Sequence, residues 1–598
     1  MLNLNIRGKW GVEVMRKYIC GVMLLIILVT AFLTVFPASS QAEETQLFTL
    51  HMVVWADDPI ALDIATAVKS EFEKIGVNLE IHSMEYGALV ELTYGETAPN
   101  YEDGGWDMDI TTWWWWPTDY VWFIGCWTAG GVPPYGWNYM RWEDSVADTY
   151  LKNGMSTYNE TERIYWLQKW QERFQENPPA ALLYWPIVPQ ITKAGLKYFS
   201  PVLWTGNAWQ WTVEGKSPED NVTIRYAVPA DPSMLNPWFM DGGWAHLEPM
   251  FSPLFRMKVI TTPTGEEKYE IIPELVKSWN ISEDGLTLTL QLMDNVTWHD
   301  GVPFTADDVV FSFEAILDED TGATSGWDLA EVVDSVEKID NYTVVLHLKT
   351  VAPHIFSLLS TGSLSILPKH VLGNVSHSEL RTHWSNTERP VPGTGPYEFV
   401  EWKKDQYMVL KAYDNYHRGK PFVDKIILVT IKDPQAALSA LRTGEVDALH
   451  PSFSQSLVGE IPALKEEEGI SVTGGIAPAI TFIGFNLNNT ILNNRYVRLA
   501  LCHAIPYDYI VNDILQGLGV KANSPVPPYW FAYNPNAPYH EYDLNKARMY
   551  LEKAGYVSRP AVTPITAYTM QIAAIGVATF IVGFIIGVLV LKIRRTEA

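Results

Sequence analysis

An uncharged apolar segment near the C-terminus restricts how this chain can be arranged in space. Ala567–Leu591 is a run of 25 residues without a charge, rich in Ile, Val, Gly and Ala. This length crosses a bilayer as one helix, and the basic residues that follow it favour the cytoplasmic side. The sequence therefore predicts a transmembrane helix at 567–591, a cytoplasmic tail at 592–598 and a body on the outer side.

The N-terminus has the pattern of an export signal. Basic side chains precede an apolar run from Ile19 to Phe36, and small residues near Ala42 offer a cleavage point. This order is typical of a secretory signal peptide, which we predict over residues 1–42. A retained N-terminal anchor is the alternative, because the apolar run is long for a cleaved signal. Under both interpretations the body is exported. With the signal removed and the C-terminal helix as the anchor, we expect a single-pass cell-membrane protein with a large extracellular part.

Composition indicates a folded protein with an acidic, water-facing surface. Of the 598 residues, 47% are hydrophobic and 19% are charged, which excludes disorder over most of the chain. The 69 acidic and 43 basic residues give a formal charge of -26, which argues against a nucleic-acid partner. Three cysteines cannot form a disulfide framework. The 25 Trp and 29 Tyr supply flat, amphipathic surface that suits a ligand cleft as well as a core.

Seven Asn-X-Ser/Thr sequons are compatible with glycosylation outside the cell, although several would arise by chance in a chain of this length. Their asparagines are Asn159, Asn221, Asn280, Asn295, Asn341, Asn374 and Asn488.

The body reads as mixed α and β. Leu50–Trp55 is a short apolar strand, apolar residues then recur at helical spacing from Ile60 to Ile75, and Val77–Ile81 alternates as a second strand. Strand, helix and strand in this order form a βαβ unit. The polar stretch Gly215–Asp220 is the best candidate for an internal linker.

Further elements are expected along the rest of the chain. Thr305 and Asp308 form a capping box at the start of a helix. The other expected strands are Thr223–Val228, Leu286–Leu292, Tyr342–Leu348, Gly395–Val400, Tyr407–Leu410 and Lys425–Ile431, and the other helices are Pro434–Arg442 and Leu544–Lys553.

Catalytic patterns are poor. The chain has no Gly-rich loop ending in Lys-Ser/Thr and no Gly-X-Ser-X-Gly turn. His377 and His383 lie close in sequence, but no Cys or third His stands at ligand spacing, which argues against a metal site. The adjacent carboxylates Asp307 and Asp308 would point in different directions. We therefore predict a binding protein rather than an enzyme, with no cofactor and no metal.

A series of motifs in the second half of the chain follows one order. They are Glu274–Trp279, Trp298–Gly301, Phe304–Ser312, Gly393–Tyr397, Pro421–Ile426, Thr443–Asp447 and Phe485–Asn486. Together they resemble the family 5 extracellular solute-binding proteins of ABC importers, the oligopeptide/dipeptide class. The resemblance implies an α/β, two-lobed, periplasmic-binding-protein-like fold of type II, whose lobes close on a ligand by a hinge.

The resemblance also implies an unusual order of segments. Residues 43–215 look like the family's C-terminal third, whereas residues 222–478 look like its first lobe and residues 479–556 like the start of its second lobe. This order predicts a circular permutation, which is tolerated where the original ends lie close together on the surface. The alternatives are two incomplete relics, or a swapped dimer in which two chains complete each other.

The family's peptide binders hold the ligand's α-amine with an Asp that follows an aromatic segment. Here Asp119 stands at the matching place, after a Trp run that includes Trp115 and Trp116. Tyr86 matches an aromatic wall residue of the second lobe. The wall of the first lobe matches the sequence Asp241, Gly242, Gly243 and Trp244, in which glycine lets a ligand backbone approach.

Two departures weaken a peptide as the ligand. Pro117 lacks the N–H with which peptide binders extend a strand onto the ligand, and Trp113 replaces a position that is basic in some members. A Trp-rich cleft also suits sugar rings. The resemblance implies two kinds of partner: a small ligand and ABC permease subunits. The ligand is expected to be a peptide, with an oligosaccharide as the alternative. A surface sensor or structural protein that kept the fold is the alternative from another class.

Overall fold

The computed structural model describes residues 46–95, 98–114, 126–133, 136–200, 203, 206–239, 244–261, 267–324 and 326–556. Within these residues, no helix is long and apolar enough to cross a membrane. The predicted signal peptide at 1–42, the predicted membrane helix at 567–591 and the tail at 592–598 all lie outside the described residues.

The chain forms two compact units. The larger one comprises Leu50–Phe72 and Leu79–Ala554 and contains nearly all described elements. The smaller one includes the start of the first strand, Glu73–Asn78 and the residues from Gly555 on. Inside the smaller unit, the rings of Phe48 and Tyr556 meet edge to face, with their centroids 4.6 Å apart.

The predicted βαβ unit is confirmed. It consists of β1 (Phe48–Trp55), α2 (Pro59–Glu73) and β2 (Val77–Met84). The apolar residues that recur at helical spacing in α2 are buried, among them Ile64, Val68 and Phe72. Gly76 follows the helix with φ 78°, a left-handed conformation that glycine adopts without strain.

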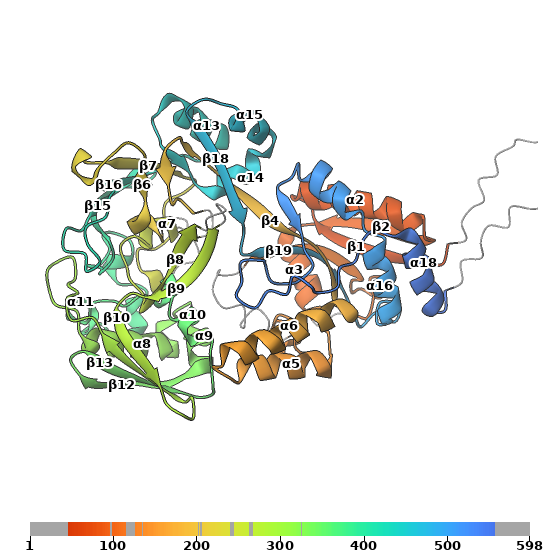
Figure 1. Ribbon diagram of the computed structural model, residues 1–598, viewed down its shortest axis with the longest axis horizontal. Coiled ribbons are helices and arrows are strands. Elements are labelled where there is room, and N and C mark those ends of the chain that lie inside the picture. The colour runs from red at the N-terminus through yellow and green to blue at the C-terminus, as the bar shows by residue number, and fades with distance from the viewer. Residues whose placement is uncertain are drawn as a thin grey trace, which may run out of the picture. The chain divides into compact units, whose positions relative to one another are not determined.

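One mixed sheet of 12 strands forms the centre of the fold. Its main path runs β14 (Tyr397–Lys403), β15 (Tyr407–Ala412), β16 (Lys425–Thr430), β7 (Thr223–Val228), β17 (Ala448–Leu449), β4 (Ala180–Lys193), β19 (Ala479–Phe485), β3 (Met108–Trp114), β1 and β2. Two further strands, β18 (Ile470–Ile476) and β20 (Gly519–Lys521), pair with β4 off this path. The sheet and its many helices confirm the predicted α/β class (Figure 1).

Strands from the two ends of the chain lie side by side in this sheet. The late strand β19 pairs with the early strand β3 along its whole length, from Ala479 opposite Trp114 to Phe485 opposite Met108. On its other edge β19 pairs with β4, where Gly484 lies opposite Ala180. Figure 1 shows the blue β19 among strands coloured for the first third of the chain. The second half of the chain therefore completes a sheet begun by the first.

A second sheet lies in the middle of the sequence. It has four antiparallel strands in the order β10 (Val276–Ile281), β11 (Thr287–Leu292), β13 (Thr343–Leu348) and β12 (Val333–Asp340). The helix α8 (Ala306–Leu317) contacts this sheet, and its N-terminus carries the predicted capping box of Thr305 and Asp308. The buried stripe of α8, which includes Val309 and Phe313, joins the surrounding core.

Two large hydrophobic cores stabilise the fold. One extends from Phe199 to Ala448 in sequence and includes the second sheet. The other combines side chains between Val53 and Trp185 with side chains between Ile480 and Ala532. This second core is also packed by the helices α5 (Ser145–Met155) and α6 (Glu160–Glu176). It cannot form without both ends of the chain.

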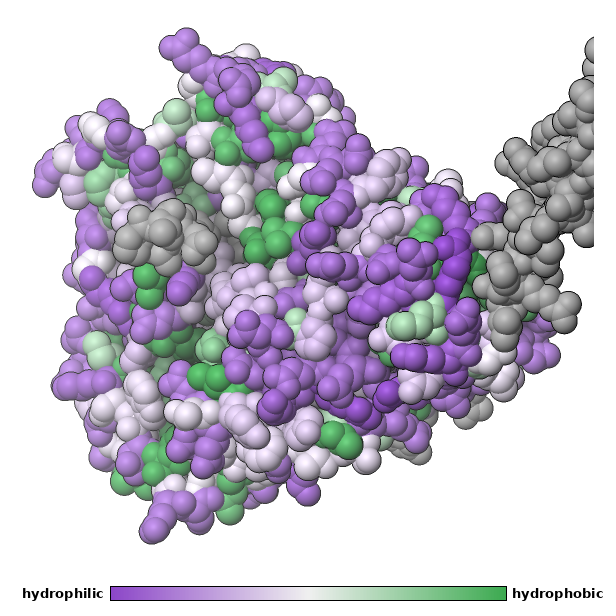
Figure 2. All heavy atoms as spheres, turned by 45° about the vertical axis from the view of Figure 1, so that its right-hand side comes forward, coloured by the Kyte–Doolittle hydropathy of each residue, from purple (hydrophilic) through white to green (hydrophobic). Residues whose placement is uncertain are grey.

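Figure 2 shows that the face in view is mostly hydrophilic, with hydrophobic residues scattered in small patches.

Candidate ligand-binding site

Three neighbouring strands end at the same edge of the central sheet. β1 pairs in parallel with β3 through Met52 opposite Met108 and Val53 opposite Asp109. β2 lies on the other side of β1, and just beyond these two strands the N–H of Ala56 donates to Met84 at 2.8 Å. In open α/β sheets, ligands bind outside the carboxyl ends of the strands. This edge is therefore the place to look for a site.

Exposed aromatic side chains gather at these strand ends. Trp55 is the last residue of β1 and is 39% exposed, and Trp114 is the last of β3 and is 51% exposed. Tyr86 begins α3 (Tyr86–Tyr94), directly after β2, and is 56% exposed. The Tyr86 and Trp55 rings are tilted against each other at a centroid distance of 5.4 Å. Large aromatic rings that remain exposed provide contact surface for a ligand.

Trp55 was not singled out by the sequence reasoning. Its position as the last residue of an apolar strand was visible, but nothing local showed that Tyr86 would lie beside it. The contact forms because the βαβ unit brings the ends of β1 and β2 together.

The adjacent Trp113 faces the core instead. Its ring packs at 5.0 Å from Trp127, at 5.7 Å from Tyr139 and at 5.1 Å from Phe482. Side chains of a strand alternate between its two faces, so Trp113 and Trp114 point in opposite directions. Trp113 therefore packs into the core, whereas Trp114 is exposed.

A buried carboxyl lies at the start of β3, the strand that ends at Trp114. Asp109 of β3 is 1% exposed, and its Oδ2 accepts the hydroxyl hydrogen of Tyr139 at 2.9 Å. Burial raises the pKa of Asp109 to about 7, although the hydrogen bond from Tyr139 opposes this shift. Gly484 lies opposite Asp109 in the ladder, and a Cβ at this glycine would collide with Asp109 Oδ1. Only a residue without a side chain fits beside this carboxyl.

The other predicted ligand contacts cannot be placed. Trp115, Trp116 and Asp119, and likewise Asp241, Gly242 and Gly243, lie outside the described residues. Trp244 is the first residue of the short helix α7 (Trp244–Leu247). Tyr86 is therefore the predicted contact whose side chain can be located.

A separate hollow of about 870 Å³ has acidic walls. Four carboxylates line it, Asp63 and Glu71 of α2 with Asp508 and Asp513, and its described lining includes no Lys or Arg. Such a hollow attracts cations in general. Its described lining includes the rings of Tyr509 and Tyr542 but no Trp.

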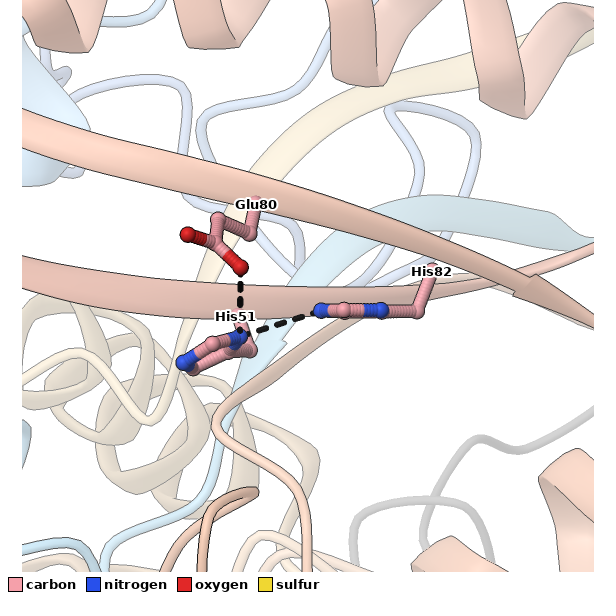
Figure 3. Close-up of side chains that lie close together, drawn as sticks. All are labelled: His51, Glu80 and His82. Carbon is pink, nitrogen blue, oxygen red and sulfur yellow. Dashed lines mark hydrogen bonds and ion pairs between the residues drawn. The ribbon is translucent and has the colours of Figure 1, made fainter.

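The histidines considered in the sequence do not meet. His377 Nδ1 lies 2.8 Å from Asp318 Oδ2, whereas His383 Nδ1 lies 2.8 Å from Ser385 Oγ. The structure instead brings together His51, Glu80 and His82, which sequence reasoning missed (Figure 3). Because β1 and β2 are separated in the sequence by α2, no local pattern showed that these three residues lie together. The sequence feature that could have indicated the group is the presence of a histidine in both strands of the βαβ unit.

All seven sequon asparagines, from Asn159 to Asn488, lie on the surface in exposed positions. The side chain of Asn159 also caps α6 by accepting from the N–H of Glu162 at 3.2 Å.

Comparisons with known proteins place this chain among binding proteins. The family described as "Bacterial extracellular solute-binding proteins, family 5 Middle" matches residues 270–583. An ABC transporter peptide-binding protein of Brucella ovis is 34% identical over 343 residues, which cover 56% of this chain and 60% of the relative. The oligopeptide-binding protein AppA of Bacillus subtilis is 31% identical over 293 residues, covering 49% and 52%.

Relatives named for another ligand are equally similar. The heme-binding protein A of Haemophilus influenzae is 30% identical over 306 residues, which cover 48% of this chain and 54% of the relative. Among solved structures, AppA of Bacillus subtilis with a bound nonapeptide matches with a TM-score of 0.42 and 26% identity, over 56% of this chain and 64% of AppA. The chain thus spans between about half and two thirds of the length of these relatives.

Proposed function

This chain belongs to the bacterial extracellular solute-binding proteins of family 5, and from that membership we infer that it captures peptides outside the cell and delivers them to an ABC permease. It is a binding protein and not an enzyme.

The aromatic cluster at the strand ends is the observation that carries this proposal. Trp55, Tyr86 and Trp114 expose their rings where parallel strands end, and the chain continues from Trp114 directly into the Trp run before Asp119. A rigid aromatic wall beside a carboxylate suits an extended peptide, because the rings cover its side chains and the carboxylate pairs with its α-amine.

In this proposal each predicted contact has a role. Asp119 binds the α-amine, and Trp115, Trp116 and Tyr86 form the wall of the second lobe. Asp241, Gly242, Gly243 and Trp244 form the facing wall of the first lobe, where the two glycines let the peptide backbone approach.

An oligosaccharide is the second candidate ligand. Exposed indole rings stack on sugar faces as well as on apolar side chains, and Pro117 cannot donate a backbone hydrogen bond to a peptide. The heme-binding relative also indicates that similarity at this level does not fix the ligand. A surface sensor or structural protein that delivers nothing is the remaining alternative.

We further propose that the chain is a circular permutation of the family's fold. In this organisation, residues 43–215 supply the end of the second lobe, residues 222–478 the first lobe and residues 479–556 the start of the second lobe. The pairing of β19 with β3 and β4 supports this proposal, as does the core shared by both ends. The linker candidate Gly215–Asp220, which is followed by Asn221 with φ 49°, would join the original ends.

The proposed membrane attachment rests on sequence. The signal at 1–42 would export the body and the helix at 567–591 would anchor it, with the tail at 592–598 in the cytoplasm. The exposed sequon asparagines are accessible to glycosylation on that outer side.

Calorimetric titration of the full-length protein tests the ligand class. Short peptides, the same peptides with an acetylated α-amine, and oligosaccharides are titrated in parallel. We expect binding of free peptides, weaker binding after acetylation, and loss of this preference in Asp119→Asn but not in Asp334→Asn, which alters an exposed carboxylate of β12. Equal binding of acetylated peptides would refute the amine site, and binding of oligosaccharides alone would favour the second candidate.

A further inference from the structure

We propose that His51, His82 and Glu80 bind a divalent transition-metal ion of the zinc type. The three residues come from neighbouring strands: His51 from β1, and Glu80 and His82 from β2. Glu80 and His82 are two positions apart in a strand, so their side chains leave the same face of the sheet. Among the described residues they are the one group whose ligand atoms lie close enough to hold a metal ion.

The ligand atoms already converge. His51 Nδ1 lies 3.0 Å from His82 Nε2 and 3.7 Å from Glu80 Oε2 (Figure 3). Two nitrogens bound at ~2.1 Å to a tetrahedral zinc ion lie roughly 3.4 Å apart. Small side-chain adjustments therefore bring all three atoms into a coordination sphere, and water would complete it. Two imidazoles and a carboxylate suit zinc better than calcium or magnesium, which prefer oxygen ligands alone.

The charges around the site favour a cation. Besides Glu80, the carboxylate of Glu102 lies beside His51, with Oε1 at 3.8 Å from His51 Nε2. Among the described residues, His51 is the only ion-pair partner of these two carboxylates. A dication bound to His51 Nδ1 would leave the Nε2–H facing Glu102. A carboxylate on the second nitrogen fixes the orientation of a metal-bound histidine and strengthens the bond.

The surrounding residues hold the ligands in place. The ring of Tyr101 stacks on both His51 and His82, at centroid distances of 4.7 and 4.2 Å. Asp107 fixes this arrangement, because it accepts the backbone N–H of His51 at 2.8 Å and that of Tyr101 at 3.0 Å. His51 is 8% exposed, whereas Glu80 and Glu102 are open to solvent, so an ion can enter from one side. The metal would link β1, β2 and the segment before β3.

Without a metal, the two histidines would only share a hydrogen bond. A metal site and a simple hydrogen bond predict different effects of zinc on the protein. An ion that binds the folded state alone raises the melting temperature, whereas an ion that does not bind leaves it unchanged. Zinc chloride is titrated into the full-length protein, purified without a polyhistidine tag and stripped with a chelator. We expect about one equivalent of zinc per chain and a rise in melting temperature that the chelator reverses.

The variants His82→Gln and Glu80→Gln test the ligands. Both residues are less buried than His51, and glutamine can keep the hydrogen bond of His82 to His51, so the metal-free melting temperature is expected to stay close to that of the wild type. We expect His82→Gln to weaken zinc binding by at least about tenfold, and Glu80→Gln to weaken it as well. His347→Gln is the control, because His347 Nε2 forms a similar pair with Glu337 Oε2 at 3.4 Å on exposed strands.

Substitution of cobalt for zinc gives a direct view of the coordination. A cobalt(II) absorption band typical of tetrahedral nitrogen and oxygen ligands should be present in the wild type and in His347→Gln but absent in His82→Gln. The proposal would be overturned if the wild type takes up no zinc, if His82→Gln binds zinc as tightly as the wild type, or if the control loses binding equally.

Discussion

Phe48 and Tyr556 contact each other edge to face at 4.6 Å, although 508 residues separate them along the chain. Phe48 opens β1, and Tyr556 stands three residues after α18 (Leu544–Lys553), the last helix among the described residues. A circular permutation would explain this contact. In the unpermuted order, the helix α18 would be followed directly by the strand β1, so Tyr556 and Phe48 would lie close to each other. The contact lets the permutation be tested by rebuilding the chain.

We predict that a rearranged chain will fold. Residues 222–556 would come first, a short flexible linker would connect Tyr556 to the segment from 46 on, and the chain would end near residue 221. Because Phe48 and Tyr556 already touch, the linker needs few residues and adds little loop entropy. Circular dichroism and a melting temperature close to that of the original body would confirm the prediction.

The same experiment separates the permutation from a swapped dimer. Light scattering should give a monomer for both the original and the rearranged protein. A dimer of the original that dissociates only on unfolding would favour exchange between chains, and failure of the rearranged chain to fold would contradict the permutation.

Asp109 makes stability depend on pH. Its pKa is about 7 in the folded protein against an ordinary value of 3.8. Between these values the folded state keeps a proton that the unfolded state has released, so the Asp109 contribution to stability falls as pH rises from about 4 to 7. Asp109→Asn keeps the hydrogen bond with Tyr139 but cannot ionise. We therefore expect the melting temperature of the variant to rise relative to the wild type across this window.

Differential scanning calorimetry at several pH values between 4 and 8 measures this effect. Asp334→Asn serves as the exposed control, for which the difference from the wild type should not change with pH. A pH-independent difference for Asp109→Asn would show that the carboxyl is ionised throughout.

Glu274 holds a buried ion-pair network in the core that includes the second sheet. Its carboxylate lies 3.3 Å from Arg256 Nε and 2.8 Å from Arg418 Nε, and it accepts the Tyr416 hydroxyl hydrogen at 2.8 Å. Burial alone would raise the pKa of Glu274. The nearby charges of Arg256, His417 and Arg418 have a larger, opposite effect, and the pKa is about 2. The stabilisation is thus present above the ordinary value of 4.5 and is lost as pH falls toward 2.

Glu274→Gln should be strongly destabilising, because it leaves the guanidinium of Arg256 buried without its anion. We expect a loss of about 3–5 kcal/mol in the free energy of unfolding, measured with a chemical denaturant. Asp307→Asn provides the contrast, since it removes two exposed pairs, with Lys369 at 3.1 Å and with Lys338, each of which should cost at most about 1 kcal/mol. Similar losses in both variants would contradict the importance of burial.

Local patterns predicted many elements well. The helix Leu544–Lys553 and the capping box of Thr305 and Asp308 agree with the structure, because both depend on residues close in sequence. The long strand β4 was not foreseen. It contains Pro186 and Pro189, which normally interrupt a strand, yet it pairs with β18, β19 and β20 in turn. Tertiary pairing outweighed the local signal there.

The site was predictable only in part. The resemblance to a family directed attention to Tyr86 and the Trp run, and the apolar patterns located the strands β1 and β2. Neither could indicate that Trp55 lies against Tyr86, or that His51 lies against His82. Both contacts depend on which strands become neighbours in the sheet, which no local pattern contains.

Tyr86→Ala tests the aromatic wall. If this ring contacts the ligand, its loss should weaken peptide binding by about tenfold, which corresponds to ~1.4 kcal/mol and is typical of an aromatic contact. Since the side chain is 56% exposed, we expect the melting temperature without ligand to stay nearly unchanged. Calorimetric titration of the full-length protein with a peptide that binds the wild type measures the change.

Tyr165→Ala is the matched control for this prediction. Tyr165 lies on α6, is 53% exposed and packs against Trp166 at 4.9 Å, much as Tyr86 packs against Trp55 at 5.4 Å. The two substitutions therefore remove the same atoms from similar surroundings, and they differ in their distance from the strand ends. Weaker binding in Tyr86→Ala alone would assign the ring to the ligand site, whereas unchanged binding in both variants would move the site away from the carboxyl ends of β1 and β2.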